Sequence, residues 1–190
     1  MRVSLIGLCV TGIVLAGCDQ TPRPSAGSGP AFDPIAFFAG STHSWGVVES
    51  RAGAPTELVV TDGHGEKDET GRLRMVQHLS FQDGTTQQRD WLLWRNGLDR
   101  FEATANDMVG SAKGQAGGNI FHWQWVLARS PGNRLMDVTM SQWMYQQDDG
   151  SVMIRTIVSK FGIIVAEVTE RFTHVATTVL GQAGVVPAGS

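Results

Sequence analysis

Hydrophobic and polar side chains alternate with a period of two over much of the chain between residues 72 and 172. The clearest runs are 72–81, 100–106, 120–128 and 135–145. In the first of them, one face carries Leu73, Met75, Leu79 and Phe81, and the other carries Arg72, Arg74, His78 and Ser80. Alternation of this period is typical of β-strands that bury one face.

Turn sequences separate these runs. Three are hairpin signals, namely Asp83-Gly84, Asn96-Gly97 and Asp148-Asp149-Gly150. Gly162 predicts a tight corner between two late strands, and an early strand over 57–61 is expected to end at Asp62-Gly63, before a polar turn over 66–71. About nine or ten strands in hairpin order predict an all-β fold, an antiparallel up-and-down β-barrel of about 8–10 strands rather than a sandwich.

A short apolar segment precedes the first strand. Asp33 is suited to cap a helical turn that starts at Pro34, and Gly40 is suited to end it. The apolar residues of this turn would then close one end of the barrel; they are Ile35, Phe37 and Phe38.

The N-terminus has the build of an export signal. Met1-Arg2 is followed by the apolar run 3–17, which is too short to span a bilayer. The run ends in Leu15-Ala16-Gly17-Cys18, which resembles the lipobox of bacterial lipoproteins. The resemblance implies cleavage before Cys18 and attachment of palmitate-type acyl chains to it, which hold the protein on a membrane.

The alternative is an ordinary signal peptide in which Cys18 is incidental. The cysteine count favours the lipoprotein: Cys9 lies within the signal, so a domain acylated at Cys18 keeps no thiol for disulfides or metals. Asp19 resembles the signal that retains some lipoproteins at the inner membrane. We therefore expect a lipid anchor on the periplasmic side of the cell envelope, with the inner membrane slightly favoured over the outer.

These features divide the chain into four parts. Residues 1–17 form the signal peptide, and 18–31, rich in Pro, Gly and Ser, form a lipidated tether. Residues 32–174 form the β-barrel domain, and 175–190 form a flexible tail with room for a short helix.

Charge and motifs exclude several functions. The formal net charge is −3 and no basic stripe occurs, which argues against nucleic-acid binding. The glycine-rich segment 110–118 lacks the spacing of a phosphate-binding loop and is better explained as a glycine-kinked pair of strands. No Gly-x-Ser-x-Gly or paired-histidine motif occurs, and His64 with Glu66 and Asp68 is the one weak candidate for an ion. We expect no cofactor or metal, and a non-enzymatic protein is favoured.

Two pairs of side chains suggest a binding site. Arg89 and Trp91 share one strand face, and Trp123 and Trp125 share another. If both faces point inward, they could form an aromatic pocket whose cation meets a carboxylate or phosphate. The alternative is a packed core in which Arg89 stacks on tryptophan and pairs with Asp107 or Glu102.

Six segments resemble a family of small proteobacterial lipoproteins known only as a domain of unknown function: Phe37-Phe38-Ala39-Gly40, Trp45-Gly46, Arg89-Asp90-Trp91, 107–114, Trp143-Met144 and Lys160-Phe161-Gly162. The likeness covers residues 32–172. It implies a lipocalin-like (calycin) barrel, in which an arginine from a late strand, Arg155 or Arg171, packs on Trp45. The chain departs from the family pattern at Gln142, where that pattern is acidic, and at Ile154.

We expect a lipocalin-like barrel that binds or shuttles an acyl lipid, a fatty-acid-like molecule or another small apolar ligand. The residues assigned to this site are Arg89, Trp91, Asp107, Trp123, Trp125 and Arg155. One alternative is an accessory envelope lipoprotein with a filled core that contacts an unidentified protein partner. The weakest is an enzyme acting on membrane lipid, with Asp107 beside Arg89 or Lys160. The volume of the cavity separates the first two.

Overall fold

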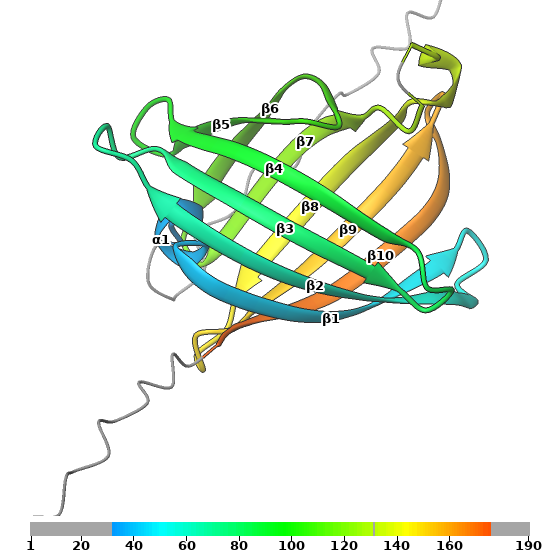
Figure 1. Cartoon of the computed structure of the whole chain (residues 1–190), viewed down its shortest axis with the longest axis horizontal. Coiled ribbons are helices and arrows are strands. Elements are labelled where there is room, and N and C mark those ends of the chain that lie inside the picture. The colour runs from blue at the N-terminus through cyan, green and yellow to red at the C-terminus, as the bar shows by residue number, and fades with distance from the viewer. Residues whose placement is uncertain (1–31, 131, 176–190) are drawn as a thin grey trace, which may run out of the picture.

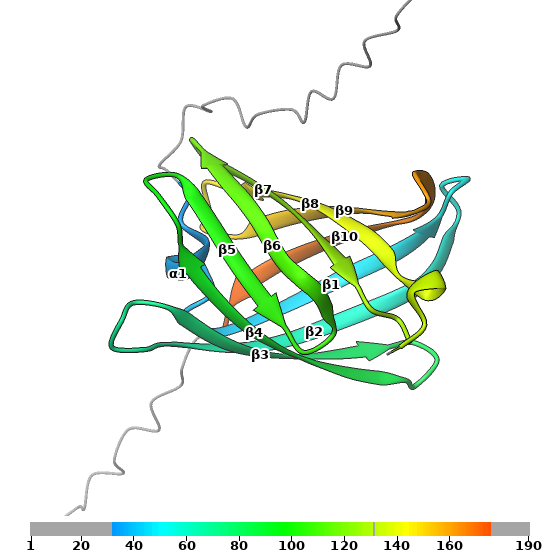
Figure 2. The ribbon, with the colours of Figure 1, turned by 90° about the horizontal axis from the view of Figure 1, so that it is seen from above.

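The computed structural model describes residues 32–130 and 132–175, which form a closed barrel of antiparallel strands (Figures 1 and 2). A short helix, α1 (Pro34–Phe37), lies at one end. The strands are β1 (Gly40–Ser50), β2 (Pro55–Lys67), β3 (Leu73–Phe81), β4 (Thr86–Arg95), β5 (Arg100–Ala105), β6 (Met108–Gly117), β7 (Ile120–Leu127), β8 (Val138–Gln146), β9 (Val152–Lys160) and β10 (Ile163–His174). A 3₁₀ turn, η1 (Arg134–Met136), precedes β8.

Each strand pairs with its neighbours in the sequence, and β1 pairs with β10 to close the sheet. Trp45 of β1, for example, lies opposite Val60 of β2 on one side and Arg171 of β10 on the other. Closure satisfies the backbone hydrogen bonds of both outer strands, so the sheet has no free edge. The prediction of an up-and-down barrel is confirmed, with ten strands.

The residues that alternate along each strand point in turn to the inside and the outside of the barrel. On β3, Leu73 and Met75 are buried whereas Arg74 is exposed, and on β5 Phe101 and Ala103 are buried. On β7 the inward residues are Phe121, Trp123, Trp125 and Leu127, as predicted. The inward apolar side chains of all these strands meet in one core.

Helix α1 closes one end of the barrel, which we call the plugged end. Asp33 caps it by accepting hydrogen bonds from the Ile35 and Ala36 amides, as its sequence predicted. Its aromatic side chains pack edge-on against the inside of the barrel: Phe38 contacts Phe172 at a ring-centroid distance of 5.7 Å. The opposite end, where β9 turns into β10, is the mouth.

The prediction that the second strand ends at Asp62-Gly63 is wrong, because β2 continues to Lys67. Gly63 and Gly65 do not make a turn but allow close approaches. A Cβ on Gly65 would lie 2.1 Å from the carbonyl oxygen of Phe38, so only glycine lets the end of α1 rest on β2. The polar turn follows later, where Asp68 accepts hydrogen bonds from the Thr70 and Arg72 amides.

The glycine-rich segment forms one strand, β6, and a hairpin with β7, not a strand pair of its own. The register between β6 and β7 shifts between Val109 and Lys113. Gly114 leaves space for the ring of Phe121, whose Cζ would lie 2.4 Å from a Cβ at that position. Glycine in this strand therefore serves core packing.

The predicted signal peptide, the tether with Cys18, and residues 176–190 of the tail lie outside the described residues. Across the part of the chain that is described, no helix has the length and apolar character needed to cross a bilayer.

Candidate functional site

The interior of the barrel changes character from one end to the other. Next to α1 it is a packed apolar core. Above this core, polar side chains from strands around the barrel form a layer, which we call the polar belt: Ser44, Thr61, Gln77, Arg89, Gln142, Thr156 and Glu170. Between the polar belt and the mouth lies an open cavity.

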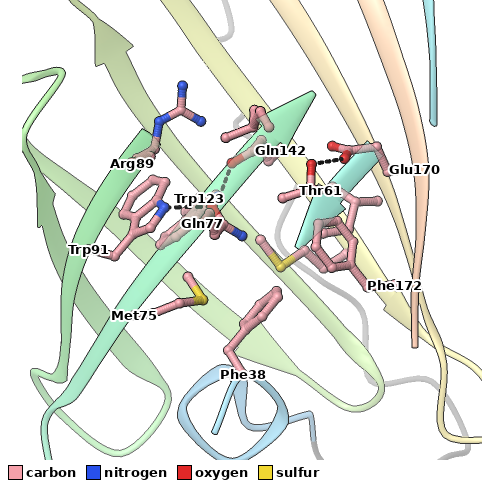
Figure 3. A pocket seen from close by; sticks show the side chains of 13 residues that line it. Phe38, Thr61, Met75, Gln77, Arg89, Trp91, Trp123, Gln142, Glu170 and Phe172 are labelled. Atoms are coloured by element: carbon pink, nitrogen blue, oxygen red, sulfur yellow. Dashed lines mark hydrogen bonds between the residues drawn. The ribbon is translucent and has the colours of Figure 1, made fainter. Parts of the chain in front are cut away.

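This cavity has a volume of about 530 Å³. Its walls are mainly aliphatic and include Val59, Leu79, Leu127, Met140, Val158 and Val168. Its floor is shared with a much smaller void of about 40 Å³ beneath it, and both are lined by Leu79, Arg89, Gln142 and Glu170 (Figure 3). A chamber with apolar walls and a few polar groups at one end has the usual build of a small-molecule site.

Arg89 is the cation of the floor and is 8% exposed. Its Nε atom donates to both carboxylate oxygens of Asp107, at 3.0 and 2.7 Å. The guanidinium carbon lies 4.8 Å from the ring centroid of Trp125 and 5.8 Å from that of Trp91. The ion pair and the aromatic rings together fix this cation where water is scarce.

Glu170 lies across the floor from Arg89 (Figure 3). Its Oε1 atom accepts hydrogen bonds from the hydroxyls of Ser44 at 3.0 Å and Thr61 at 3.1 Å. Burial raises the pKa of the Glu170 carboxyl, although these two hydrogen bonds and the positive charge of Arg89 oppose the rise. Its neutral form is therefore favoured relative to a carboxyl in water.

Gln142 holds the tryptophans in place. Its Oε1 atom accepts from the indole nitrogens of Trp123 at 2.6 Å and Trp125 at 2.9 Å, and its amide donates to Thr156 at 2.9 Å. Trp91 stacks on Trp123 with their centroids 5.0 Å apart. The tryptophans are thus packed beneath the large cavity and do not line it, which agrees with the packed-core alternative.

Five of the six residues assigned to the site from the sequence come together: Arg89, Trp91, Asp107, Trp123 and Trp125. The structure does not bring Arg155 to them. It lies exposed on the outside of the barrel, where it pairs with Glu167 at 2.6 Å. Successive residues of a strand point to opposite faces, and its neighbours Ile154 and Thr156 are the ones that point inward.

Neither predicted arginine is seen to pack on Trp45. That residue is 60% exposed on the outer face and stacks edge-on against His43. Arg171 lies opposite it in register but binds Asp149 and Ser151. Lys160, proposed as a partner of Asp107, instead places its Nζ atom 4.0 Å from Met136 Sδ in the loop before β8.

Two floor residues, Gln142 and Glu170, were missed as site residues. The signal was available, because each interrupts an apolar strand face at period two. Glu170 lies between Val168 and Phe172, and Gln142 between Met140 and Met144. A polar group on a buried strand face needs a partner or a function.

The mouth carries exposed apolar residues on one side. Phe161, at the tip of the β9–β10 hairpin, is 78% exposed, and Leu135 in the loop before β8 is 70% exposed. Phe161 takes a positive φ of 50°, as does Gly162 at 78°, which gives the tight corner that was predicted.

No group of three or more His, Cys, Asp or Glu side chains suited to a metal ion occurs within residues 32–130 and 132–175. His64, the weak candidate, has its Nε2 atom 3.4 Å from Glu66 Oε1, whereas Asp68 binds Thr70 and Arg72 instead.

A closed antiparallel barrel with one plugged end and one open cavity is a lipocalin-like fold. Among solved structures, the S-type phycobiliprotein lyase CPES from Guillardia theta is similar, with a TM-score of 0.58 and 9% identity over 75% of this chain and 91% of that chain. Identity this low shows a common fold alone. The chain belongs to a family of proteins of unknown function, DUF3833, whose family model matches residues 12–174. No curated protein matches it.

Proposed function

We propose that the barrel binds or carries an acyl lipid or another small apolar molecule in the cavity at its mouth, as a lipid-anchored protein of the bacterial cell envelope. The observation behind the binding role is the cavity of about 530 Å³ with aliphatic walls. Ligand pockets usually measure several hundred Å³, whereas a filled barrel leaves only voids near the size of a water molecule.

The proposed location has a separate basis. The sequence Leu15-Ala16-Gly17-Cys18 resembles a lipobox, and it falls inside the residues matched by the family model. In this proposal Cys18 carries the acyl chains on the periplasmic side, with the inner membrane slightly favoured over the outer. Cys18→Ser should move the protein from the membrane fraction to the soluble periplasmic fraction. Persistent membrane association of the variant would contradict the lipid anchor.

The binding role is tested first on material from the cell. The mature domain carrying Cys18→Ser is purified from a Gram-negative periplasm, and its extract is compared by mass spectrometry with that of another periplasmic protein. We expect a stoichiometric apolar molecule in the first extract only. An empty protein that also leaves the emission of a fluorescent fatty acid unchanged would contradict the proposal.

A pair of variants ties binding to the cavity. Val168→Trp on β10 adds a large side chain to the cavity wall and should abolish binding. Val76→Trp makes the same change on the outer face of β3, where Val76 is 39% exposed, and should leave binding intact. Equal binding by both variants would place the ligand elsewhere.

One observation favours a second function, contact with a protein partner. The apolar tip of the β9–β10 hairpin, including Phe161 and Ile163, is exposed beside the mouth. A partner that receives the ligand would approach there. Phe161→Glu should then impair transfer to the partner but not binding of the ligand by the purified barrel, and an effect on binding alone would argue against this contact.

A further inference from the structure

We propose that the ligand is an apolar chain ending in a carboxylate, which enters head-first and binds between Arg89 and the carboxylic acid of Glu170. This inference rests on the proposed function and specifies the chemistry of the same site. It depends on which atoms of the floor have partners and which face the cavity.

Arg89 has unused donors. Only its Nε atom bonds to Asp107, and no partner of Nη1 or Nη2 occurs among the described residues. Neither Nη atom is among the enclosed polar atoms that lack a partner, so both are accessible, and Arg89 lines the cavity. A guanidinium presents its N–H groups as a planar fork that matches the two oxygens of a carboxylate.

Glu170 has one unused oxygen. The hydroxyls of Ser44 and Thr61 both donate to Oε1, and Oε2 has no partner in the described part of the chain. Like the Arg89 Nη atoms, Oε2 is not enclosed. A proton on the neutral acid would therefore be held by Oε2, from which it can be donated into the cavity.

The charges around this point balance as long as Glu170 is neutral. Arg89 and Asp107 cancel, while the groups that neighbouring strands turn toward Glu170, namely Ser44, Thr61, Gln142 and Thr156, are neutral. The other charged residues lining the cavity are Glu57, Asp83 and Arg129. An incoming carboxylate gains the Arg89 fork and one O–H donor while Glu170 is neutral, but meets like-charge repulsion once Glu170 ionises.

The orientation follows from where the polar groups lie. Arg89, Gln142 and Glu170 form the floor, whereas the walls above are aliphatic. A chain that entered tail-first would cover the floor with methyl groups and leave buried polar atoms unpaired, which is costly. Head-first entry pairs these atoms and places the chain against Val158, Val168 and Met140.

The first test compares two probes on the unaltered barrel, produced as the soluble Cys18→Ser form. Dodecanoic acid and dodecan-1-ol share one chain length and differ in the head group. We expect the acid to bind about ten- to a hundredfold more tightly, the range given by hydrogen bonds to a charged group. Equal affinities would overturn the carboxylate assignment and leave the binding function standing, and failure of both probes to bind would overturn both.

The second test uses variants. Arg89→Met should lose the preference for the acid while keeping the affinity for the alcohol, and Arg155→Met, an arginine on the outer face, is the matched control. In the unaltered barrel, affinity for the acid should fall as the pH rises through the raised pKa of Glu170, whereas affinity for the alcohol should not. Glu170→Gln should remove this fall, and a fall that persists in the variant would overturn the role of Glu170.

Discussion

The plugged half and the hollow half of this barrel share most of their strands but are filled differently. At the plugged end, aromatic side chains from α1, β5 and β7 meet edge to face, as Phe101 and Phe121 do at 5.5 Å. Toward the mouth, every strand except β5 and β6 contributes to the cavity wall, mainly with smaller aliphatic side chains that leave an open volume of about 530 Å³. The difference shows that one half of a small barrel can supply enough burial for the other to stay hollow.

The polar belt marks the boundary between the halves. Its members form hydrogen bonds to one another or to neighbouring side chains, as when Gln142 joins two tryptophans to Thr156. Arg89 and Glu170 both keep donors or acceptors without a partner in the described part of the chain, and both residues line the hollow side. The hydrogen bonds made within the packed half thereby determine which polar groups are available to a ligand in the hollow half.

The largest expected effect contrasts two phenylalanines. Phe121 is fully buried at the plugged end, so Phe121→Ala should lower the free energy of unfolding by about 3–5 kcal/mol. Phe81 lines the mouth, and Phe81→Ala should cost less than about 1 kcal/mol because it leaves no enclosed void. Urea denaturation measures both. Similar losses would mean that the mouth contributes to the folding core.

Two glycines sharpen the contrast. Gly65→Ala should cost about 1–3 kcal/mol, because its Cβ would meet the Phe38 carbonyl oxygen at 2.1 Å and displace α1. At Gly46 the nearest atom to an added Cβ is Cγ of Glu170, a side chain that can shift into the cavity, and the nearest backbone atom, the carbonyl oxygen of Thr169, is farther away at 2.9 Å. Gly46→Ala should therefore be the milder change in thermal unfolding. The reverse order would show that α1 is loosely seated.

Changes of pH should act on the two halves in opposite directions. The raised pKa of Glu170 means that the folded state holds this proton longer than the unfolded state, so stability falls as pH rises from the unfolded pKa through the folded one. Glu170→Gln should be more stable than the parent at neutral pH, with the difference shrinking toward about pH 4. Denaturation at several pH values measures this, and a constant difference would contradict it.

At the plugged end the sign is reversed. A hydrogen bond from the Thr70 hydroxyl, with further ones from the Arg72 side chain and the two backbone amides, lowers the pKa of Asp68 in the β2–β3 turn to about 2. Its stabilising contribution is therefore present above the unfolded pKa and is lost as pH falls toward about 2. Asp68→Asn should destabilise the barrel at neutral pH but not at the acid end of this range.

The smallest effect is expected outside the barrel. Arg155 is paired with Glu167 on the surface, so Arg155→Met should change the free energy of unfolding by less than about 1 kcal/mol and leave ligand affinity unaltered. Titration with dodecanoic acid checks the second point. A loss of affinity would extend the site beyond the cavity.

Local sequence signals were sufficient for most of the barrel. Alternation assigned the faces of β3, β5 and β7, and turn dipeptides such as Asn96-Gly97, in the loop 96–99, placed the hairpins. The same reasoning misplaced the end of β2, because a glycine that permits a tertiary contact looks like a glycine that permits a turn. The approach of Phe38 to Gly65 distinguishes them, and it exists only in the folded chain.

The site could be predicted only in part. Arg89, Trp91 and Asp107 were found because a cation near tryptophan on an apolar strand face needs a partner. Glu170 depends on hydroxyls from β1 and β2, more than a hundred residues away in the sequence, and no local pattern connects them. The spacing of residues in the sequence also does not show whether an inward-pointing tryptophan lines a cavity or fills the core.

The closed end of the barrel determines the route by which a ligand can enter and leave. A tube open at both ends could act as a conduit, loading at one side and unloading at the other. In the part of the chain that the structure describes, helix α1 and the aromatic residues beneath it close one end of the barrel and leave the cavity open at the mouth. A bound ligand must therefore enter and leave through the mouth. A protein or membrane that donates the ligand and one that accepts it would compete for this end of the barrel, so loading and release would take place in separate encounters.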